Sequence, residues 1–247
     1  MSTPNSTTAR RIVSLMDLTS LNDTDDAAAV RKLCGLAMSA AGRVAAVCIW
    51  PRFIQVARSA LLGTGVPVAV VANFPGGSDE IGQVAAEAAA AVAAGAGEVD
   101  VVFPYRRLLA GDVDTGLALV RRCREACGPH VVLKVILETG QLELPQAIRR
   151  AAETALAGGA DFLKTSTGKT QPGVTPQAVA VLLDVIAEAR AGGRAVGLKV
   201  SGGIRTVAAA CSLLDQYEQR FGPQSATPAT FRIGASTLIT ELLARMD

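Results

Sequence analysis

The stretch VVLKVILETGQLELPQAIRRAAETALAGGADFLKTST, residues 131–167, decides the fold. It begins with the apolar run VVLKVILE, continues through the helical segment LPQAIRRAAETALAGGA, and ends in a second apolar run, ADFLKTST. Short β-branched runs on either side of a helix that ends in Gly are typical of two parallel strands joined by a crossover helix. The stretch therefore predicts one strand–helix–strand unit.

The same unit recurs along the whole chain. Apolar runs start roughly 25 to 35 residues apart, the length of such a unit. They are IVSLMDLT, RVAAVCIW, VPVAVVANF, EVDVVFPY, VVLKVILE, ADFLKTST, AVGLKVSG and FRIGAS. Eight units favour an α/β fold of the closed (β/α)8 type over an open doubly wound sheet, because no GxGxxG follows the first two runs. Without an internal linker, we predict one barrel domain over residues 11–247, with a helical N-terminal lead-in at most, and a flexible N-terminus over residues 1–10.

Composition narrows the class of function. The 24 Lys and Arg residues nearly balance the 22 Asp and Glu residues, and no basic run alternates with aromatics, so no nucleic-acid partner is expected. The Ala-rich segment from Val84 is too short to span a bilayer and contains Glu87, so no membrane partner is expected. The five cysteines form no CxxC pair, and the start MSTPNSTTARR lacks a signal-peptide apolar stretch, which together indicate the reducing cytoplasm.

Three lysines, Lys134, Lys164 and Lys199, lie inside apolar runs that predict buried strands. A buried ammonium without a partner is costly, and a barrel places its chemistry at the ends of its strands, so the lysines predict a site there. Lys164 and Lys199 stand on the consecutive sixth and seventh strands and can face one cavity. The alternatives for each lysine are a structural ion pair and a side chain that snorkels to the rim.

A reactive amine is the chemistry that such lysines permit. Lysine attacks a carbonyl only when neutral, and moving its pKa from about 10.4 to near 7 corresponds to roughly 4 kcal/mol. Burial and a second ammonium both act in that direction. We therefore expect Lys164 and Lys199 to suppress each other's charge, and Lys134 to give electrostatic support.

Two carboxylates occupy equally apolar surroundings. Asp100 lies in EVDVVFPY and Asp17 in LMDLTSLND, where each needs a cationic partner. Asp100 is expected to pair with the lysines and relay protons. Asp17 has the same character. A purely structural salt bridge is the alternative for both residues, and for Asp17 the two alternatives are equal.

The last two loops predict an anion site. SGGIRT follows the seventh strand, and Gly234 to Thr237 lead from the eighth strand into a helix, so backbone N–H groups face the barrel mouth. Barrels commonly bind phosphate between these two loops. Ordinary N-capping by Ser236 is the alternative.

No metal or cofactor is expected. The chain has one histidine, His130, in the loop GPHVV, which excludes a centre built from several histidines. We interpret His130 as a loop residue.

Seven motifs together resemble the deoxyribose-phosphate aldolases, class I Schiff-base aldolases on a (β/α)8 barrel. They are MDLTSLN, VCIWPRFI, EVDVVFPY, LKVILETG, ADFLKTSTGK, GLKVSGGIRT and RIGAST, in order from residue 16 to residue 237. The resemblance implies a metal-free, reversible cleavage of 2-deoxy-D-ribose 5-phosphate to D-glyceraldehyde 3-phosphate and acetaldehyde, in deoxyribonucleoside catabolism. Its alternatives are a class I aldolase for another sugar phosphate and a non-catalytic sugar-phosphate-binding barrel.

The resemblance also implies roles for individual residues. Lys164 would form the Schiff base, and Lys199 would tune it and move protons with Asp100. Other matched residues would line the substrate site, namely Thr19, Cys48 and Lys169, or hold the phosphate, namely Gly202, Gly203, Ser236 and Thr237. The resemblance alone suggests a homodimer.

Two positions depart from the family pattern. Many members carry a C-terminal tail that ends in Tyr, whereas this chain reads ELLARMD at its end, so water is expected to protonate the enamine, or that step to be slower. Val200 stands where the family more often has Ala or Pro, a tolerable apolar exchange.

Overall fold

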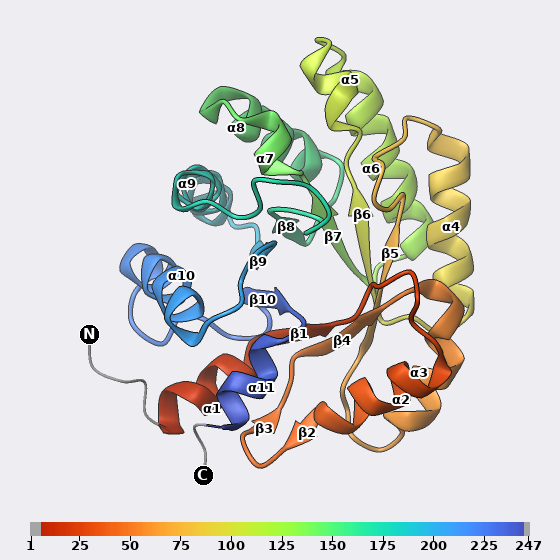
Figure 1. Ribbon diagram of the computed structural model, residues 1–247. Coiled ribbons are helices and arrows are strands. Elements are labelled where there is room, and N and C mark those ends of the chain that lie inside the picture. The colour runs from red at the N-terminus through yellow and green to blue at the C-terminus, as the bar shows by residue number, and fades with distance from the viewer. Residues whose placement is uncertain (1–5, 245–247) are drawn as a thin grey trace.

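Eight parallel strands close into a barrel in the computed structural model, which describes residues 6–244 (Figure 1). The strands are β1 (Met16–Thr19), β4 (Ala46–Ile49), β5 (Val68–Ala72), β6 (Glu98–Val102), β7 (Val132–Ile136), β8 (Phe162–Lys164), β9 (Gly197–Ser201) and β10 (Phe231–Ala235). Each strand pairs with the next one along the chain, and β10 closes the ring by pairing with β1. The predicted (β/α)8 barrel is confirmed, and each of the eight predicted apolar runs contributes one strand.

Helices follow every barrel strand and surround the barrel (Figure 1). The main ones are α2 (Ala27–Leu36), α3 (Ile54–Ala60), α4 (Ile81–Ala93), α6 (Val113–Cys127), α8 (Pro145–Ala157), α9 (Pro176–Ala191), α10 (Val207–Phe221) and α11 (Leu238–Leu243). Shorter elements are η1 (Pro51–Phe53), α5 (Tyr105–Leu109), α7 (Thr139–Leu142) and the hairpin of β2 (Met38–Ser39) and β3 (Gly42–Arg43). Within residues 6–244, no helix combines the length and the apolar character that crossing a bilayer requires.

The N-terminal segment differs from the prediction. Helix α1 (Ser6–Ser14) begins inside the segment expected to be flexible, and it buries Ala9, Ile12 and Val13. Figure 1 shows α1 beside α11, in agreement with the contacts between the two helices. Ile12 and Val13 therefore belong to an amphipathic helix rather than to the first strand, which begins only at Met16. Residues 1–5 of the predicted N-terminal segment lie outside the described residues.

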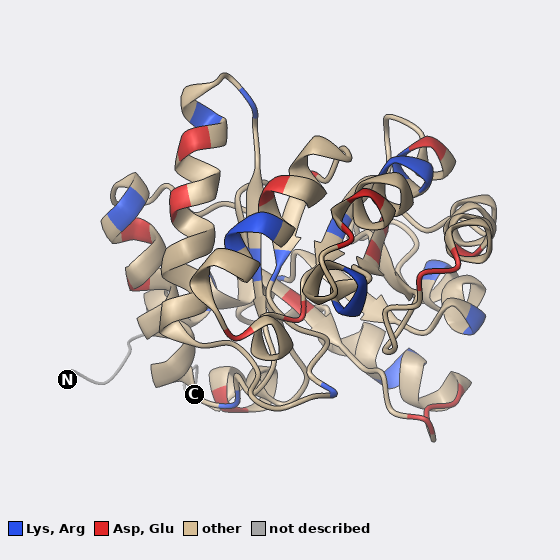
Figure 2. Cartoon of the chain, turned by 90° about the horizontal axis from the view of Figure 1, so that it is seen from above, with Lys and Arg blue, Asp and Glu red and all other residues tan. Residues whose placement is uncertain are grey.

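The two faces of the strands are both buried but carry different side chains. The outward face packs against the helices in one large apolar cluster, to which β6 contributes Val99 and Val101 and β9 contributes Leu198 and Val200. The inward face carries charged residues on one side of the barrel, and Figure 2 shows Lys, Arg, Asp and Glu on inner strand segments as well as on the outer helices. The other side of the interior holds a small apolar cluster, Leu21, Ala46, Cys48, Ala69 and Val71.

Candidate active site

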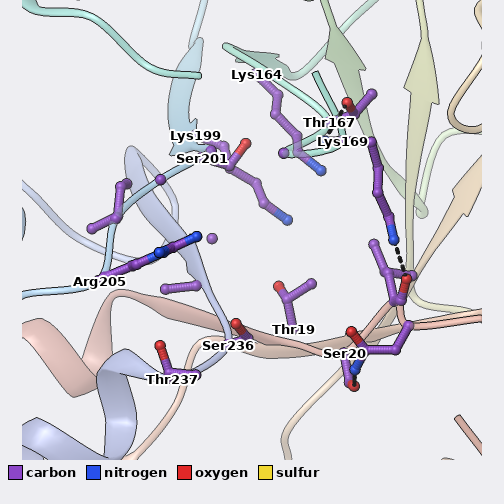
Figure 3. A pocket seen from close by; sticks show the side chains of 18 residues that line it. Thr19, Ser20, Lys164, Thr167, Lys169, Lys199, Ser201, Arg205, Ser236 and Thr237 are labelled. Atoms are coloured by element: carbon purple, nitrogen blue, oxygen red, sulfur yellow. Dashed lines mark hydrogen bonds between the residues drawn. The ribbon is translucent and has the colours of Figure 1, made fainter. Parts of the chain in front are cut away.

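A cavity of about 440 Å³ opens at the carboxyl ends of the strands (Figure 3). The loops after β1, β8, β9 and β10 form it. Its walls consist of residues 19–22, Lys164, 167–169, Lys199, 201–205 and 234–237. In Figure 3 the side chains of Lys164 and Lys199 point side by side into this space, with Arg205, Ser236 and Thr237 on one side and Lys169 on the other. The strand ends therefore meet at one site, as the sequence predicts.

Three lysine amines surround one carboxylate at the floor of the cavity. Asp100 Oδ2 accepts from Lys164 Nζ at 2.8 Å and from Lys199 Nζ at 2.7 Å, and Asp100 Oδ1 accepts from Lys134 Nζ at 2.8 Å. Lys199 lies on β9 and Asp100 on β6, which are not neighbouring strands, so these contacts cross the barrel interior. Asp100 and Lys134 are fully buried and Lys164 is 3% exposed, so only the lysines of β8 and β9 reach the cavity wall.

A second layer of charges lies around this trio. Lys199 Nζ is 2.5 Å from Asp17 Oδ2, and Lys134 Nζ is 2.5 Å from Glu98 Oε2. Arg232 joins the two carboxylates, because Nη1 donates to Asp17 Oδ1 at 2.6 Å and Nη2 donates to Glu98 Oε1 at 2.9 Å. The structure thus places Asp17 and Lys134 in the same buried charge cluster as Lys164, Lys199 and Asp100.

Glu98 and Arg232 are site residues that the sequence analysis did not single out. Glu98 precedes Asp100 by two positions, so the two-residue period of a strand places both on one face. Arg232 sits in the run FRIGAS, and it too alternates with outward apolar neighbours, Phe231 and Ile233. The period of two was the available signal in both strands.

The buried cluster contains one more cation than carboxylates. Its cations are Lys134, Lys164, Lys199 and Arg232, and its carboxylates are Asp17, Glu98 and Asp100. Among the described residues, Lys164 has a single carboxylate partner, whereas the other three cations each contact at least two. A buried excess charge is unfavourable, so Lys164 is the amine that most readily gives up its proton.

The pKa shifts follow from these contacts. Burial lowers the pKa of the Lys164 amine, Asp100 opposes this, and the Lys199 ammonium lowers it further, with a net pKa below the ordinary value. For Lys199, burial acts in the same direction, but Asp100 and Asp17 outweigh it and hold the pKa above the ordinary value. Burial alone would raise the pKa of Asp100, but the three lysines hold it well below the usual range. The two cavity lysines therefore do not suppress each other equally, since Lys199 keeps its proton.

Cys48 and Thr19 occupy different positions relative to the cavity. Thr19 lines it, and its Oγ1 donates to the carbonyl oxygen of Asp17 at 2.8 Å. Cys48 was expected to line the substrate site, but it is fully buried in the small apolar cluster and is not part of the cavity wall. Burial raises the pKa of its thiol, so the sulfur is held as a neutral, weakly polar group beneath the lysines.

Lys169 connects loops from distant parts of the chain. Its Nζ donates to the carbonyl oxygen of Leu21 at 2.7 Å, drawn as a dashed line in Figure 3. The loop that carries Lys169 is held by Glu138, a fully buried carboxylate that accepts from Thr167 Oγ1 at 2.6 Å. Glu138 is not evident from the sequence, because its partner lies 29 residues further along the chain.

The predicted anion-binding residues lie together at one end of the cavity. Gly202 and Gly203 have φ angles of 96° and 84°, a left-handed conformation that favours glycine. Helix α11 begins after Thr237, whose side chain makes no capping hydrogen bond, so N-capping by Ser236 is not the arrangement found. Arg205, which the sequence analysis did not select, also lines this end and supplies a positive charge.

The Gly202 loop is fixed by its neighbour. Val174 N donates to the carbonyl oxygen of Gly202 at 3.1 Å. A Cβ atom on Gly173 would lie 2.4 Å from that same oxygen, so the two backbones pack directly on each other. The loop after β8 therefore supports the glycines of the loop after β9.

The chain is similar to a family of known proteins in sequence and in fold. The family model described as DeoC/LacD family aldolase matches residues 11–230. A crystal structure of a putative deoxyribose-phosphate aldolase from Toxoplasma gondii ME49 is similar at a TM-score of 0.88 and 28% identity, covering 98% of this chain and 94% of that one. A putative deoxyribose-phosphate aldolase from Coccidioides immitis matches at a TM-score of 0.82 and 29% identity, covering 98% and 88%. The deoxyribose phosphate aldolase from Aeropyrum pernix, described as tetrameric, shares the fold at a TM-score of 0.74 and 24% identity, covering 96% and 91%.

Proposed function

Because the chain belongs to the DeoC/LacD family of aldolases, we propose that it cleaves 2-deoxy-D-ribose 5-phosphate reversibly to D-glyceraldehyde 3-phosphate and acetaldehyde through a Schiff base on Lys164. The observation that carries the proposal is the state of that amine. Lys164 is buried, has a pKa below its ordinary value, and opens on the cavity beside Lys199. A lowered pKa increases the fraction of the amine that is neutral, and the neutral amine is the form that attacks an aldehyde.

The first half of the reaction forms the imine. The neutral Lys164 Nζ attacks the C1 aldehyde carbon of the substrate and gives a carbinolamine. Lys199, which also faces the cavity and keeps its proton, donates that proton as the hydroxyl leaves as water. The product is a protonated imine, which withdraws electrons from C2.

The second half breaks the C2–C3 bond. The electron pair of that bond moves into the imine and gives an enamine, while the C3 hydroxyl loses its proton and becomes the aldehyde of glyceraldehyde 3-phosphate. Asp100 does not line the cavity, so a water molecule carries this proton to the Asp100–Lys199 pair, whose atoms are 2.7 Å apart. The enamine is then protonated at C2, and water hydrolyses the imine to release acetaldehyde.

The anionic end of the substrate fits the opposite wall. Gly202, Gly203, Ser236 and Thr237 would bind the phosphate through backbone and hydroxyl groups, and Arg205 would add a charge-assisted contact. Lys169 and Thr19 would contact the sugar between the phosphate and Lys164.

The cellular compartment, the metabolic role and the oligomeric state are also part of the proposal. The five cysteines, all within residues 6–244, form no disulfide with one another there, which suits the reducing cytoplasm, and the activity would serve deoxyribonucleoside catabolism. The reaction would need no metal, because the protonated imine accepts the electrons of the broken bond. A homodimer remains a proposal from the family resemblance.

Reductive trapping tests the nucleophile. Borohydride added with acetaldehyde is expected to leave a two-carbon adduct on Lys164, located by peptide mass spectrometry. Lys164→Met is expected to lose both the adduct and all detectable turnover, whereas Lys32→Met, at an exposed position on α2, keeps both. An adduct on Lys199 or Lys134 in the unmodified protein would refute the assignment.

Substrate profiling tests the reaction itself. Release of acetaldehyde from 2-deoxyribose 5-phosphate, with much slower turnover of unphosphorylated 2-deoxyribose, is expected. Imine trapping on Lys164 combined with turnover of a different sugar phosphate would instead favour the other class I aldolase activity. Binding of the sugar phosphate without any adduct would favour a non-catalytic barrel.

A further inference from the structure

We propose that Glu98 and Arg232, which do not line the cavity, are positioning residues that decide which amine of the buried cluster is neutral. The proposal deepens the proposed function, because the neutral amine it explains is the nucleophile assigned above. It concerns the protonation of Lys164 in the free protein, which can be measured without any turnover.

Two chains of contacts link these residues to Lys164. One chain starts at Arg232 and passes through Asp17 and Lys199 to Asp100, with successive contacts of 2.6, 2.5 and 2.7 Å. The other starts at Glu98 and passes through Lys134 to Asp100, with contacts of 2.5 and 2.8 Å. Both end on the carboxylate that holds Lys164 Nζ at 2.8 Å.

Arg232 is fixed in place from several directions. Besides Asp17 and Glu98, its Nε donates to the carbonyl oxygen of Pro228, and its guanidinium lies 5.7 Å from the ring centre of Phe162. A guanidinium does not lose its proton in a protein, so Arg232 is a permanent buried positive charge. It cannot be the group that relieves the excess charge of the cluster.

Lys134 also keeps its positive charge. Lys134 has Asp100 and Glu98 within 2.8 Å, and its pKa lies above the ordinary value because these carboxylates outweigh burial. Among the described residues, the ionisable groups that act directly on Lys164 are Asp100 on β6, Lys199 on β9 and the neutral thiol of Cys48 on β4. Asp17 on β1 and Glu98 on β6 lie one contact further away, on Lys199 and Lys134. The inward residues of β5 in the small apolar cluster, Ala69 and Val71, bear no charge. Lys164 is thus left as the amine whose proton balances the cluster.

The charge count predicts that removing Glu98 and removing Arg232 shift the pKa of Lys164 in opposite directions. Glu98→Gln removes a negative charge, so a proton on Lys164 becomes less favourable and the pKa of Lys164 falls. Arg232→Gln removes a positive charge, so the proton becomes more favourable and the pKa rises. Each shift is expected to be about one pH unit, the size that one charge produces at roughly 10 Å in a protein interior. The double variant Glu98→Gln/Arg232→Gln restores the original excess and should titrate close to the unmodified protein.

Competitive labelling with trace acetic anhydride measures this protonation directly. The extent of acetylation of Lys164, read by peptide mass spectrometry between pH 5 and 11, gives the pKa of its amine, and the exposed Lys32 serves as the reference in every variant. Arg232→Lys keeps the positive charge but loses the planar guanidinium with its several N–H donors. It should leave the pKa of Lys164 within a few tenths of a unit of that in the unmodified protein. A merely structural role would move both single variants in the same direction or not at all.

The outcomes separate cleanly. Opposite shifts that cancel in the double variant support the proposal, and shifts of one sign, or no shift in folded Glu98→Gln, overturn it. If circular dichroism shows that Arg232→Gln does not fold, Glu98→Gln is compared with the double variant. The proposal then requires that the pKa of Lys164 falls in Glu98→Gln and returns in the double variant. Opposite shifts without a borohydride adduct on Lys164 would refute the proposed function while leaving this inference intact.

Discussion

The inward and outward faces of the same strands follow opposite rules. On β9, Leu198 packs outward among the helices while Lys199 points inward to Asp17 and Asp100. On β6, Val99 faces out and Asp100 faces in. Both faces are equally buried, so burial alone does not distinguish stability from chemistry. The difference teaches that the outer layer holds the barrel together by apolar contact, while the inner layer tolerates desolvated charges because each has partners.

Adjacent residues of β9 give the sharpest test of this division. Lys199→Leu is expected to lower kcat about 10²- to 10⁴-fold at pH 7, because the proton donor is lost and Lys164 binds its own proton more tightly. Raising the pH should recover part of the rate. Steady-state kinetics from pH 6 to 10 measures both effects, and a loss that stays the same at every pH would contradict the role in lowering the pKa of Lys164.

The neighbouring outward residue should give the reverse result. Leu198→Ala is expected to reduce the free energy of unfolding by about 2–5 kcal/mol, because it leaves a cavity in the apolar layer. Its kcat should remain close to that of the unmodified protein at a temperature where the variant is folded. Urea denaturation gives the first quantity, and a folded Leu198→Ala protein without activity would break the separation between the faces.

Acid titration tests the inner layer as a source of stability. Burial alone would raise the pKa of Asp17, but Lys199, Arg232 and Lys134 outweigh it and lower the pKa below the unfolded value of about 3.9. The ionised carboxylate therefore contributes stability above that value, and the contribution is lost as the pH falls through the folded pKa. Asp17→Asn should flatten the decline in unfolding free energy below about pH 5, with the exposed Asp23→Asn as the control for one lost charge. An unchanged decline in Asp17→Asn would show that Asp17 does not contribute.

The smallest effects on stability are expected from Gly→Ala substitutions in the outer helices, where they should distinguish tightly packed from open positions. A Cβ atom on Gly116 would lie 2.3 Å from the ring of Phe103, so Gly116→Ala should destabilise α6 by about 1–3 kcal/mol. Gly35 in α2 has no atom within 4 Å of such a Cβ, so Gly35→Ala should stabilise by up to about 1 kcal/mol. Thermal unfolding of the two variants measures the contrast, and equal shifts would mean that the packing around Phe103 is looser than the contact indicates.

The sequence predicts what depends on local pattern. Eight apolar runs with intervening helices give the barrel, and lysine inside such a run is conspicuous because its charge has no local partner. Lys164, Lys199 and Asp100 could thus be found without a structure. Asp100 and Asp17 contact Lys199 from strands that are not neighbours of β9, so the sequence could not show that Lys199 keeps its proton through a second carboxylate.

For other residues a local pattern gives the face of the strand but not the partners. Glu98 and Arg232 stand at or near strand starts, where a charged residue usually meets solvent, yet they bind each other across the interior. Cys48 stands in a matched motif, but the inward position of its side chain places it beneath the cavity. Helix α1 agrees with a helical lead-in to the barrel, but its start inside residues 1–10 is hard to predict because its few buried residues, Ala9, Ile12 and Val13, are surrounded by polar ones.

The contact between Asp17 and Arg232 has a consequence for how the chain folds. The two residues are 215 positions apart, and the strands that carry them, β1 and β10, pair only when the ring closes. Contacts of such long sequence separation form late, since the loop-closure entropy must first be overcome. Lys164 therefore lacks its full set of neighbours while the barrel is open, and we expect an unfinished chain to hold it as an ordinary protonated amine.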